Sequence, residues 1–235
     1  MGKQEIDFNS ALSKKESILV LLYLPVHLFI LPNIAGYLLN KGIIGEPEAN
    51  LLIYVVGALY MLAVGWKFLR RDFDPFLDNL FYCIAAIGIS YGLMFIFNLL
   101  VNTLLMKFLP YENPNNAAIV GIADQEYGKT AALAIFLAPI LEEMLFRAGI
   151  FGCIRKRSRI LAYIVSVLAF SIYHIWAFAL ENPSYWIYIV QYIPVSYLLC
   201  RVYEKCGSIW SSIGFHMLVN AISIKVLVMA QEMLA

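Results

Sequence analysis

Residues 130–152 read TAALAIFLAPILEEMLFRAGIFG. This stretch decides the fold because it is apolar over more than the ~20 residues that a helix needs to cross the hydrocarbon layer. It nevertheless carries Glu142, Glu143 and Arg147 in its second half. A charged residue near the centre of a bilayer costs ~2.5 to 3.5 kcal/mol on insertion scales. The stretch therefore predicts a membrane-spanning helix whose charged groups have protein partners, water or a function.

The rest of the 235-residue chain is also unusually apolar. Hydrophobic residues make up 62% and charged residues 14%, and the mean hydropathy is +0.76. A soluble globular domain does not have this composition, so the surplus apolar surface has to face lipid. We expect one all-α domain, 1–235, a polytopic transmembrane helix bundle with about seven spans, at 17–39, 50–69, 77–105, 130–151, 160–180, 185–202 and 209–234. An eighth span is the alternative, if Pro194 or Lys225 marks a broken helix.

Polar and helix-breaking residues separate these spans, because backbone groups can leave helical pairing only near water or inside protein. Asp72, Asp74 and Pro75 are expected to form the loop between the second and third spans. A longer polar stretch, 110–129, is expected to be the one sizeable loop, where it could cap a site.

The basic residues are distributed unevenly over the two sides of this bundle. Short loops with many Lys and Arg residues stay in the cytoplasm, which predicts a cytoplasmic N-terminus. The inner side then holds Lys3, Lys14, Lys15, Lys67, Arg70, Arg71, Arg155, Lys156, Arg157, Arg159, Arg201 and Lys205, and the outer side holds at most Lys41, Lys107, Lys129 and Lys225.

Two classes of function find no support in the composition. The net charge is +1, whereas nucleic-acid binding needs a basic face that neutralises phosphates. The four cysteines form no CxxC pair, so they indicate small buried hydrophobic side chains rather than a zinc cage or a disulfide framework; they are Cys83, Cys153, Cys200 and Cys206.

The three charged residues of 130–152 differ in their expected roles. Glu143 and Arg147 are four residues apart, so they face the same side of a helix and can form an ion pair. Glu142 points about 100° away and has no local cation. Helix-packing contacts in a channel or transporter are one interpretation of the pair, whereas the free Glu142 favours a function.

Further polar groups occur in the later spans. His174 lies well inside the fifth span, and His216 and Asn220 lie one turn apart in the seventh. His27, in the first span, has no evident partner in its local sequence and is interpreted as structural. Together the intramembrane carboxylates, His174, His216 and Asn220 indicate a buried site.

These groups suit the hydrolysis of an amide bond. A carboxylate or an imidazole can take the proton from water, and His and Asn can donate hydrogen bonds to the tetrahedral oxygen. The sequence does not separate directly activated water from metal-activated water, so no cofactor is assigned with certainty. Zn²⁺ held by Glu142, His174 and His216 is the alternative, although the spacing does not match an HExxH helix.

The motifs resemble those of one family. Glu142, Glu143 and Arg147 resemble an EExxxR motif, Phe170 with His174 an FxxxH motif, and His216 with Asn220 an HxxxN motif. In this order, each on its own apolar span, they are similar to the CPBP intramembrane proteases, also called the Abi or CAAX protease and bacteriocin-processing family, which is related to the eukaryotic CAAX prenyl endopeptidase. The resemblance covers 110–223 as a catalytic core, including the ENPNNAAI stretch at 112–119. Members often have a further helix after HxxxN, and here only 15 residues follow Asn220.

The resemblance implies specific roles. Glu142 and His174 would activate water, His216 and Asn220 would form the oxyanion hole, and Glu143 and Arg147 would support the site. The implied protein is an intramembrane endopeptidase in a cavity buried in the membrane. Family members are described both as metalloproteases and as metal-independent glutamate proteases, so zinc stays open.

The expected substrate is a hydrophobic, lipidated or membrane-associated peptide or protein, cleaved near the cytoplasmic leaflet. Membrane lipid is the other expected partner, and the short loops suggest a prokaryotic cell membrane. Two alternatives are a non-catalytic membrane binding or bacteriocin-immunity protein that sequesters a peptide in the same site, and an ion-coupled transporter whose carboxylates relay protons.

Overall fold

The fold is known from a computed structural model, which describes residues 8–108 and 113–234. Within these residues all regular structure is helical, which confirms the all-α class. The elements are α1 (Lys14–Pro25), η1 (Val26–Ile30), α2 (Leu31–Asn40), α3 (Glu46–Asp78), α4 (Leu80–Phe108), α5 (Pro114–Ala132), η2 (Leu133–Leu137), α6 (Ala138–Glu143), η3 (Met144–Phe151), α7 (Gly152–Arg155), α8 (Arg159–Glu181), η4 (Pro183–Tyr188), α9 (Ile189–Cys206) and α10 (Ile209–Leu234).

Five helical segments of the described chain are long and apolar enough to cross a membrane: Lys14–Asn40, Glu46–Asp78, Leu80–Leu105, Arg159–Glu181 and Ile209–Ala230. They correspond to five of the seven expected spans. The expected spans at 130–151 and 185–202 do not meet the same criteria. The first is divided among the end of α5, η2, α6 and η3. The second is divided between η4 and the 18-residue α9, which also holds Arg201, Glu204 and Lys205. A count of seven therefore stays a prediction.

The predicted loop at 72–75 is wrong, because α3 continues as a helix to Asp78. Asp72 is buried inside the protein, where one carboxylate oxygen accepts the backbone N–H of Ile209 at 2.5 Å. The hydroxyl of Ser208 donates to the backbone carbonyl of Asp72 at 2.7 Å. Asp72 thus satisfies a free N–H group at the start of α10, and a polar residue that resembled a loop signal is a tertiary cap.

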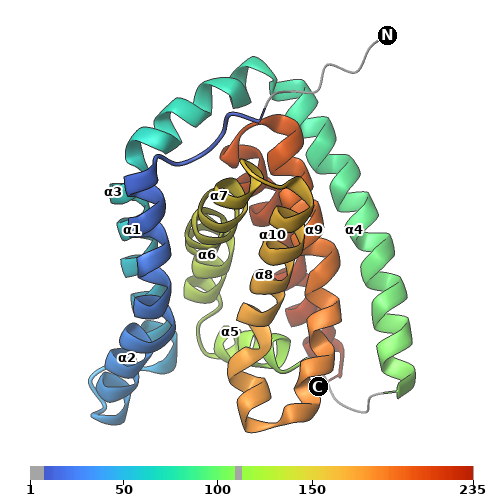
Figure 1. The fold of residues 1–235 in the computed structure, drawn as a ribbon. Helices are drawn as coiled ribbons and strands as arrows, with labels where there is room; N and C mark the ends of the chain where they lie inside the picture. Colours follow the sequence, from blue (N-terminus) through green and yellow to red (C-terminus); the bar gives the residue numbers. More distant parts are fainter. Residues whose placement is uncertain (1–7, 109–112, 235) are drawn as a thin grey trace.

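The polar stretch expected as a loop at 110–129 is mostly helical. Residues 109–112 lie outside the described part of the chain. From Pro114 onward the stretch forms α5, capped by the side chain of Asn113, which accepts the N–H of Asn115 at 3.0 Å. A kink at Glu126 interrupts α5, and the helix lies across one end of the bundle (Figure 1).

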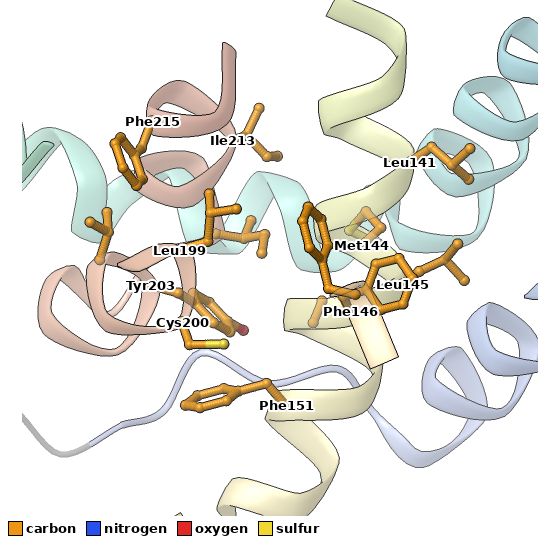
Figure 2. Close-up of a cluster of buried hydrophobic side chains, with 14 of the residues drawn as sticks. Leu141, Met144, Leu145, Phe146, Phe151, Leu199, Cys200, Tyr203, Ile213 and Phe215 are labelled. Atoms are coloured by element: carbon orange, nitrogen blue, oxygen red, sulfur yellow. The ribbon is translucent and has the colours of Figure 1, made fainter. Parts of the chain in front are cut away.

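The core joins the helices that carry the polar motifs. Apolar side chains from α6 and η3 meet those of α9 and α10 in one buried cluster, whose labelled members in Figure 2 are Leu141, Met144, Leu145, Phe146, Phe151, Leu199, Cys200, Tyr203, Ile213 and Phe215. On the other side, α3 approaches α6 closely at Gly57, where a Cβ atom would lie 3.0 Å from the Leu141 side chain. Close packing on both sides fixes the position of Glu142 and Glu143.

Candidate active site

Glu142 lies at the meeting point of three helices. Its carboxylate oxygen Oε2 is 3.8 Å from Nε2 of His174 on α8 and 3.7 Å from Nε2 of His216 on α10. This oxygen is buried and has no hydrogen-bond partner among the described residues. The structure therefore brings together three residues that are separated by more than thirty positions in the sequence, as the motifs predicted.

Glu143 faces a different set of groups. It is fully buried, and its Oε1 lies 3.2 Å from Nη1 of Arg147 and 2.8 Å from Nδ1 of His216. Its other oxygen accepts a hydrogen bond from the hydroxyl of Ser212 at 2.5 Å. The expected ion pair with Arg147 is present, and the same carboxylate also orients His216.

Arg147 is held from three directions. Its Nη2 donates to the backbone carbonyl of Ser196 at 3.3 Å and to the Ser196 hydroxyl at 3.1 Å. Its guanidinium lies 4.2 Å from the centre of the Phe170 ring, within the range of a cation–π contact. Phe170 of the FxxxH motif thus contacts Arg147 of the EExxxR motif. Phe170 therefore helps to hold Arg147 in place, in addition to its contact with His174.

The hydrogen bonds at Nδ1 determine which nitrogen of each neutral histidine is free. A backbone carbonyl accepts only, so Nδ1 of His174, 2.9 Å from the carbonyl of Phe170, must carry the proton. Nδ1 of His216 donates in the same way to the Glu143 carboxylate. In the neutral imidazoles both Nε2 atoms therefore have a lone pair, and both face Glu142. Three proton acceptors converge on one position.

The ring of His174 is also fixed by stacking. The Tyr192 ring from α9 lies on it, with 4.5 Å between ring centres and 25° between planes. The Tyr192 hydroxyl accepts hydrogen bonds from the side chains of Asn113 and Asn115, each at 3.1 Å. The cap and first turn of α5 therefore help to position His174 through the ring of Tyr192.

Asn220 makes a contact that its motif does not predict. Its side-chain nitrogen donates to the backbone carbonyl of Ala134 at 2.8 Å. In η2 the N–H of Ala138 pairs with the carbonyl of Leu133, so the next donor in line for Ala134 would be residue 139. That residue is Pro139, which has no N–H, and Asn220 takes its place. An oxyanion role for Asn220 stays a prediction, which its second amide hydrogen would serve.

We expect Asn220→Ala to lower the free energy of unfolding by about 1 to 3 kcal/mol, because it leaves the Ala134 carbonyl without a donor. Denaturant titration of the purified protein in detergent measures this loss. Ser223→Ala, which also removes a polar group lining the cavity from α10, is the matched control and should change stability little. Equal stability of Asn220→Ala and the wild type would show that the carbonyl does not depend on Asn220.

Sequence reasoning missed several residues of the site. Ser212 lies four residues before His216, so a helical-face argument could have found it. Ser196 and Tyr192 come from α9, a helix without any motif, and only tertiary packing reveals them. His27 forms a hydrogen bond with the Tyr173 hydroxyl at 2.8 Å, so it has a partner on α8, next to His174 in the sequence. Its structural role stays a prediction.

A cavity of about 640 Å³ opens in front of Glu142. Its walls are mainly apolar, and Glu142 is the one Asp, Glu, Lys or Arg side chain among the described residues that line it. Other lining residues include Tyr54, His174, Tyr192, His216 and Asn220. The site expected from the sequence thus borders a space large enough for a segment of peptide.

The cavity lies away from the basic end of the bundle. Along α3, Pro47, Asn50 and Tyr54 line it, whereas Arg70 and Arg71 lie about 30 Å farther along the same helix at 1.5 Å per residue. The first residues of α5 and α9 also line it. This position does not support the expectation of a site reached from the side of the basic loops.

Three of the groups that line the cavity are also possible metal ligands. Glu142, His174 and His216 offer atoms of the kinds that zinc accepts. Within residues 8–108 and 113–234, however, no group of three or more His, Cys, Asp and Glu side chains is arranged so that it could hold a metal ion. Zinc held by Glu142, His174 and His216 stays a prediction.

Comparison with known families bears on this arrangement. Residues 127–222 match the family model described as Rce1-like, type II CAAX prenyl endopeptidase Rce1-like. The matched segment contains the EExxxR, FxxxH and HxxxN motifs and hence Glu142, Glu143, His174 and His216. Neither a curated protein nor a solved structure matches the chain. Several apolar helices and this match together support an integral membrane protein, and over residues 127–222 the chain is similar to the CAAX-type proteases of the CPBP family.

Proposed function

We propose that this protein is an intramembrane endopeptidase that hydrolyses a peptide bond in a hydrophobic, lipidated or membrane-associated peptide. The family implies a peptidase of the CAAX protease type. The observation that carries the proposal is the buried oxygen of Glu142, which faces a cavity between the Nε2 atoms of His174 and His216. A buried carboxylate oxygen with two imidazole nitrogens beside it suits the activation of water better than it suits packing.

In the proposed mechanism, water binds between Glu142 and His174. Glu142 accepts a proton as the water oxygen attacks the carbonyl carbon of the peptide bond, which forms a tetrahedral oxyanion. The proton then passes to the amide nitrogen, the C–N bond breaks, and the products are a carboxylic acid and an amine. His174 orients the water toward the carbonyl carbon, because Phe170 and Tyr192 fix the position of its ring.

His216 serves the oxyanion in its protonated form. Glu143 holds Nδ1 at 2.8 Å and stabilises the imidazolium, so Nε2–H can donate toward the cavity. Arg147 keeps Glu143 ionised and in place. The second N–H of Asn220 is the further donor that the motif implies.

The test is a cleavage assay with the purified protein in liposomes. Apolar and lipidated peptides are incubated with the wild type and with Glu142→Gln, and mass spectrometry detects new peptide ends. Ends that appear with the wild type alone support the proposal. Peptides that bind without being cut would instead favour sequestration, and an added chelator reports whether cleavage depends on a metal.

We also propose that the cavity opens on the side opposite the basic loops. A cysteine at Asn116, which lines the cavity, is expected to react with a membrane-impermeant maleimide from one side of the membrane, and a cysteine at exposed Arg157 from the other. Labelling is compared between intact cells and inverted vesicles. The wild type gives the background labelling of the four native cysteines. If the charge bias sets the topology, Arg157 is cytoplasmic. Labelling of both positions from one side would refute this arrangement.

A further inference from the structure

Neutral amide side chains form one wall of the cavity. They come from α4, from the start of α5 with its cap, and from the start of α9, and they are Asn98, Asn102, Asn113, Asn115, Asn116 and Gln191. Apolar residues line the cavity as well, and they include Ile119, Ile122, Leu133 and Val219. None of the described lining residues is a Lys or an Arg.

The amide wall is a connected structure. Gln191 donates to the side-chain oxygen of Asn102 at 2.8 Å, and Asn113 donates to the side-chain oxygen of Gln191 at 2.5 Å. These bonds join α4, α9 and the cap of α5. The side-chain oxygen of Asn98 is buried and has no hydrogen-bond partner among the described residues. Carboxamides offer both donors and acceptors, which is the pattern of a peptide backbone.

The charges around the cavity disfavour an anion. A carboxylate inside it would lie near Glu142, and no Lys or Arg among the described residues lines the cavity to offset the loss of water. A proton on His216 is already balanced by Glu143 at 2.8 Å. The nearby cations are already paired. Arg147 is fully buried against Glu143, and Lys129 lies 2.5 Å from a carboxylate oxygen of Glu48.

We infer that the cavity binds an internal, uncharged segment of the substrate, whose backbone forms hydrogen bonds with the amide wall. The C-terminal carboxylate of the substrate then stays outside the cavity. The inference rests on the proposed function, because it names the substrate class of the same site. A Cys-a-a-X tail with a free carboxylate three residues after the lipidated cysteine is then a poorer substrate than a chain that continues past the cut.

The test compares three peptides that share one lipidated cysteine and the same uncharged sequence around it. The first ends in a free carboxylate three residues later, the second ends there in an amide, and the third continues for ten neutral residues. We expect kcat/KM for the amide and the extended peptide to be at least tenfold higher than for the carboxylate peptide. Equal or faster cleavage of the carboxylate peptide would overturn the inference.

Binding separates this inference from the proposed function. Each peptide competes with a fluorescent lipopeptide for the wild-type protein, and this measurement needs no cleavage. If no peptide is cut, the proposed function fails, while the order of the three affinities still decides the inference. The amide and the extended peptide are expected to compete at least tenfold better than the carboxylate peptide.

A lysine in the amide wall should reverse the preference. Asn116→Lys places a cation beside the cavity, and it should raise the affinity for the carboxylate peptide relative to the amide peptide at least tenfold. Asn116→Met, of similar length and uncharged, is the matched control and should leave the ratio unchanged. Gln191→Lys repeats the test from α9. If neither lysine changes the ratio, charge does not govern binding and the inference is wrong.

Discussion

Glu142→Gln is expected to reduce the rate of peptide cleavage by about 10²- to 10⁴-fold, the usual contribution of a general base. Glutamine keeps the size and polarity of the side chain, but it cannot accept a proton from water at neutral pH. Oε2 of Glu142 makes no hydrogen bond to a described residue, so the substitution removes no protein contact there. The measurement is the initial rate of product formation in liposomes.

The control for this variant is Glu181→Gln, which neutralises an exposed carboxylate at the end of α8. It should cleave at the wild-type rate. The thermal stability of Glu142→Gln should equal or exceed that of the wild type, because the substitution removes a buried charge and takes no hydrogen bond from Oε2. Normal cleavage by a folded Glu142→Gln protein would exclude Glu142 as the base.

The local sequence pattern predicted the parts of the site that lie on single helices. The spacing of Glu143 and Arg147 predicted an ion pair, and the structure contains it at 3.2 Å. The order of the three motifs, each in its own apolar segment, predicted that α6, α8 and α10 meet. The ion pair could be predicted because residues four apart on a helix always face the same side. The buried site could be predicted because charged residues inside apolar segments need partners within the protein.

The parts that sequence could not predict depend on tertiary packing. Asp72 resembled a loop residue, but it caps α10 from within α3. Asn220 was expected to face a reaction intermediate, and in the structure it also replaces the N–H that Pro139 lacks. Tyr192 positions His174 from a helix without a motif. In each case the decisive partner lies far away in the sequence, where no spacing rule applies.

Arg147→Met is expected to destabilise the protein by about 3 to 5 kcal/mol, as loss of one partner of a buried ion pair generally does. The substitution leaves the Glu143 carboxylate buried without its cation, and it removes the contacts of Arg147 with Ser196 and Phe170. Denaturant titration in detergent measures the effect. Arg159→Met is the matched control: Arg159 is 63% exposed, and its partner Glu204 keeps a second cation, Arg155, at 2.5 Å. The loss should therefore be about 1 kcal/mol or less.

A second substitution separates the charge from the packing. In Glu143→Gln with Arg147→Met, both members of the ion pair are neutral, so position 143 no longer buries an unpaired charge and much of the lost stability should return. Cleavage should not return with it, because His216 no longer has a carboxylate at Nδ1 to stabilise its protonated form. A double variant as unstable as Arg147→Met alone would show that packing against Phe170 and Ser196, rather than the buried charge, determines the cost. A double variant that cleaves normally would show that His216 acts without Glu143, and the oxyanion role proposed for His216 would then have to be given up.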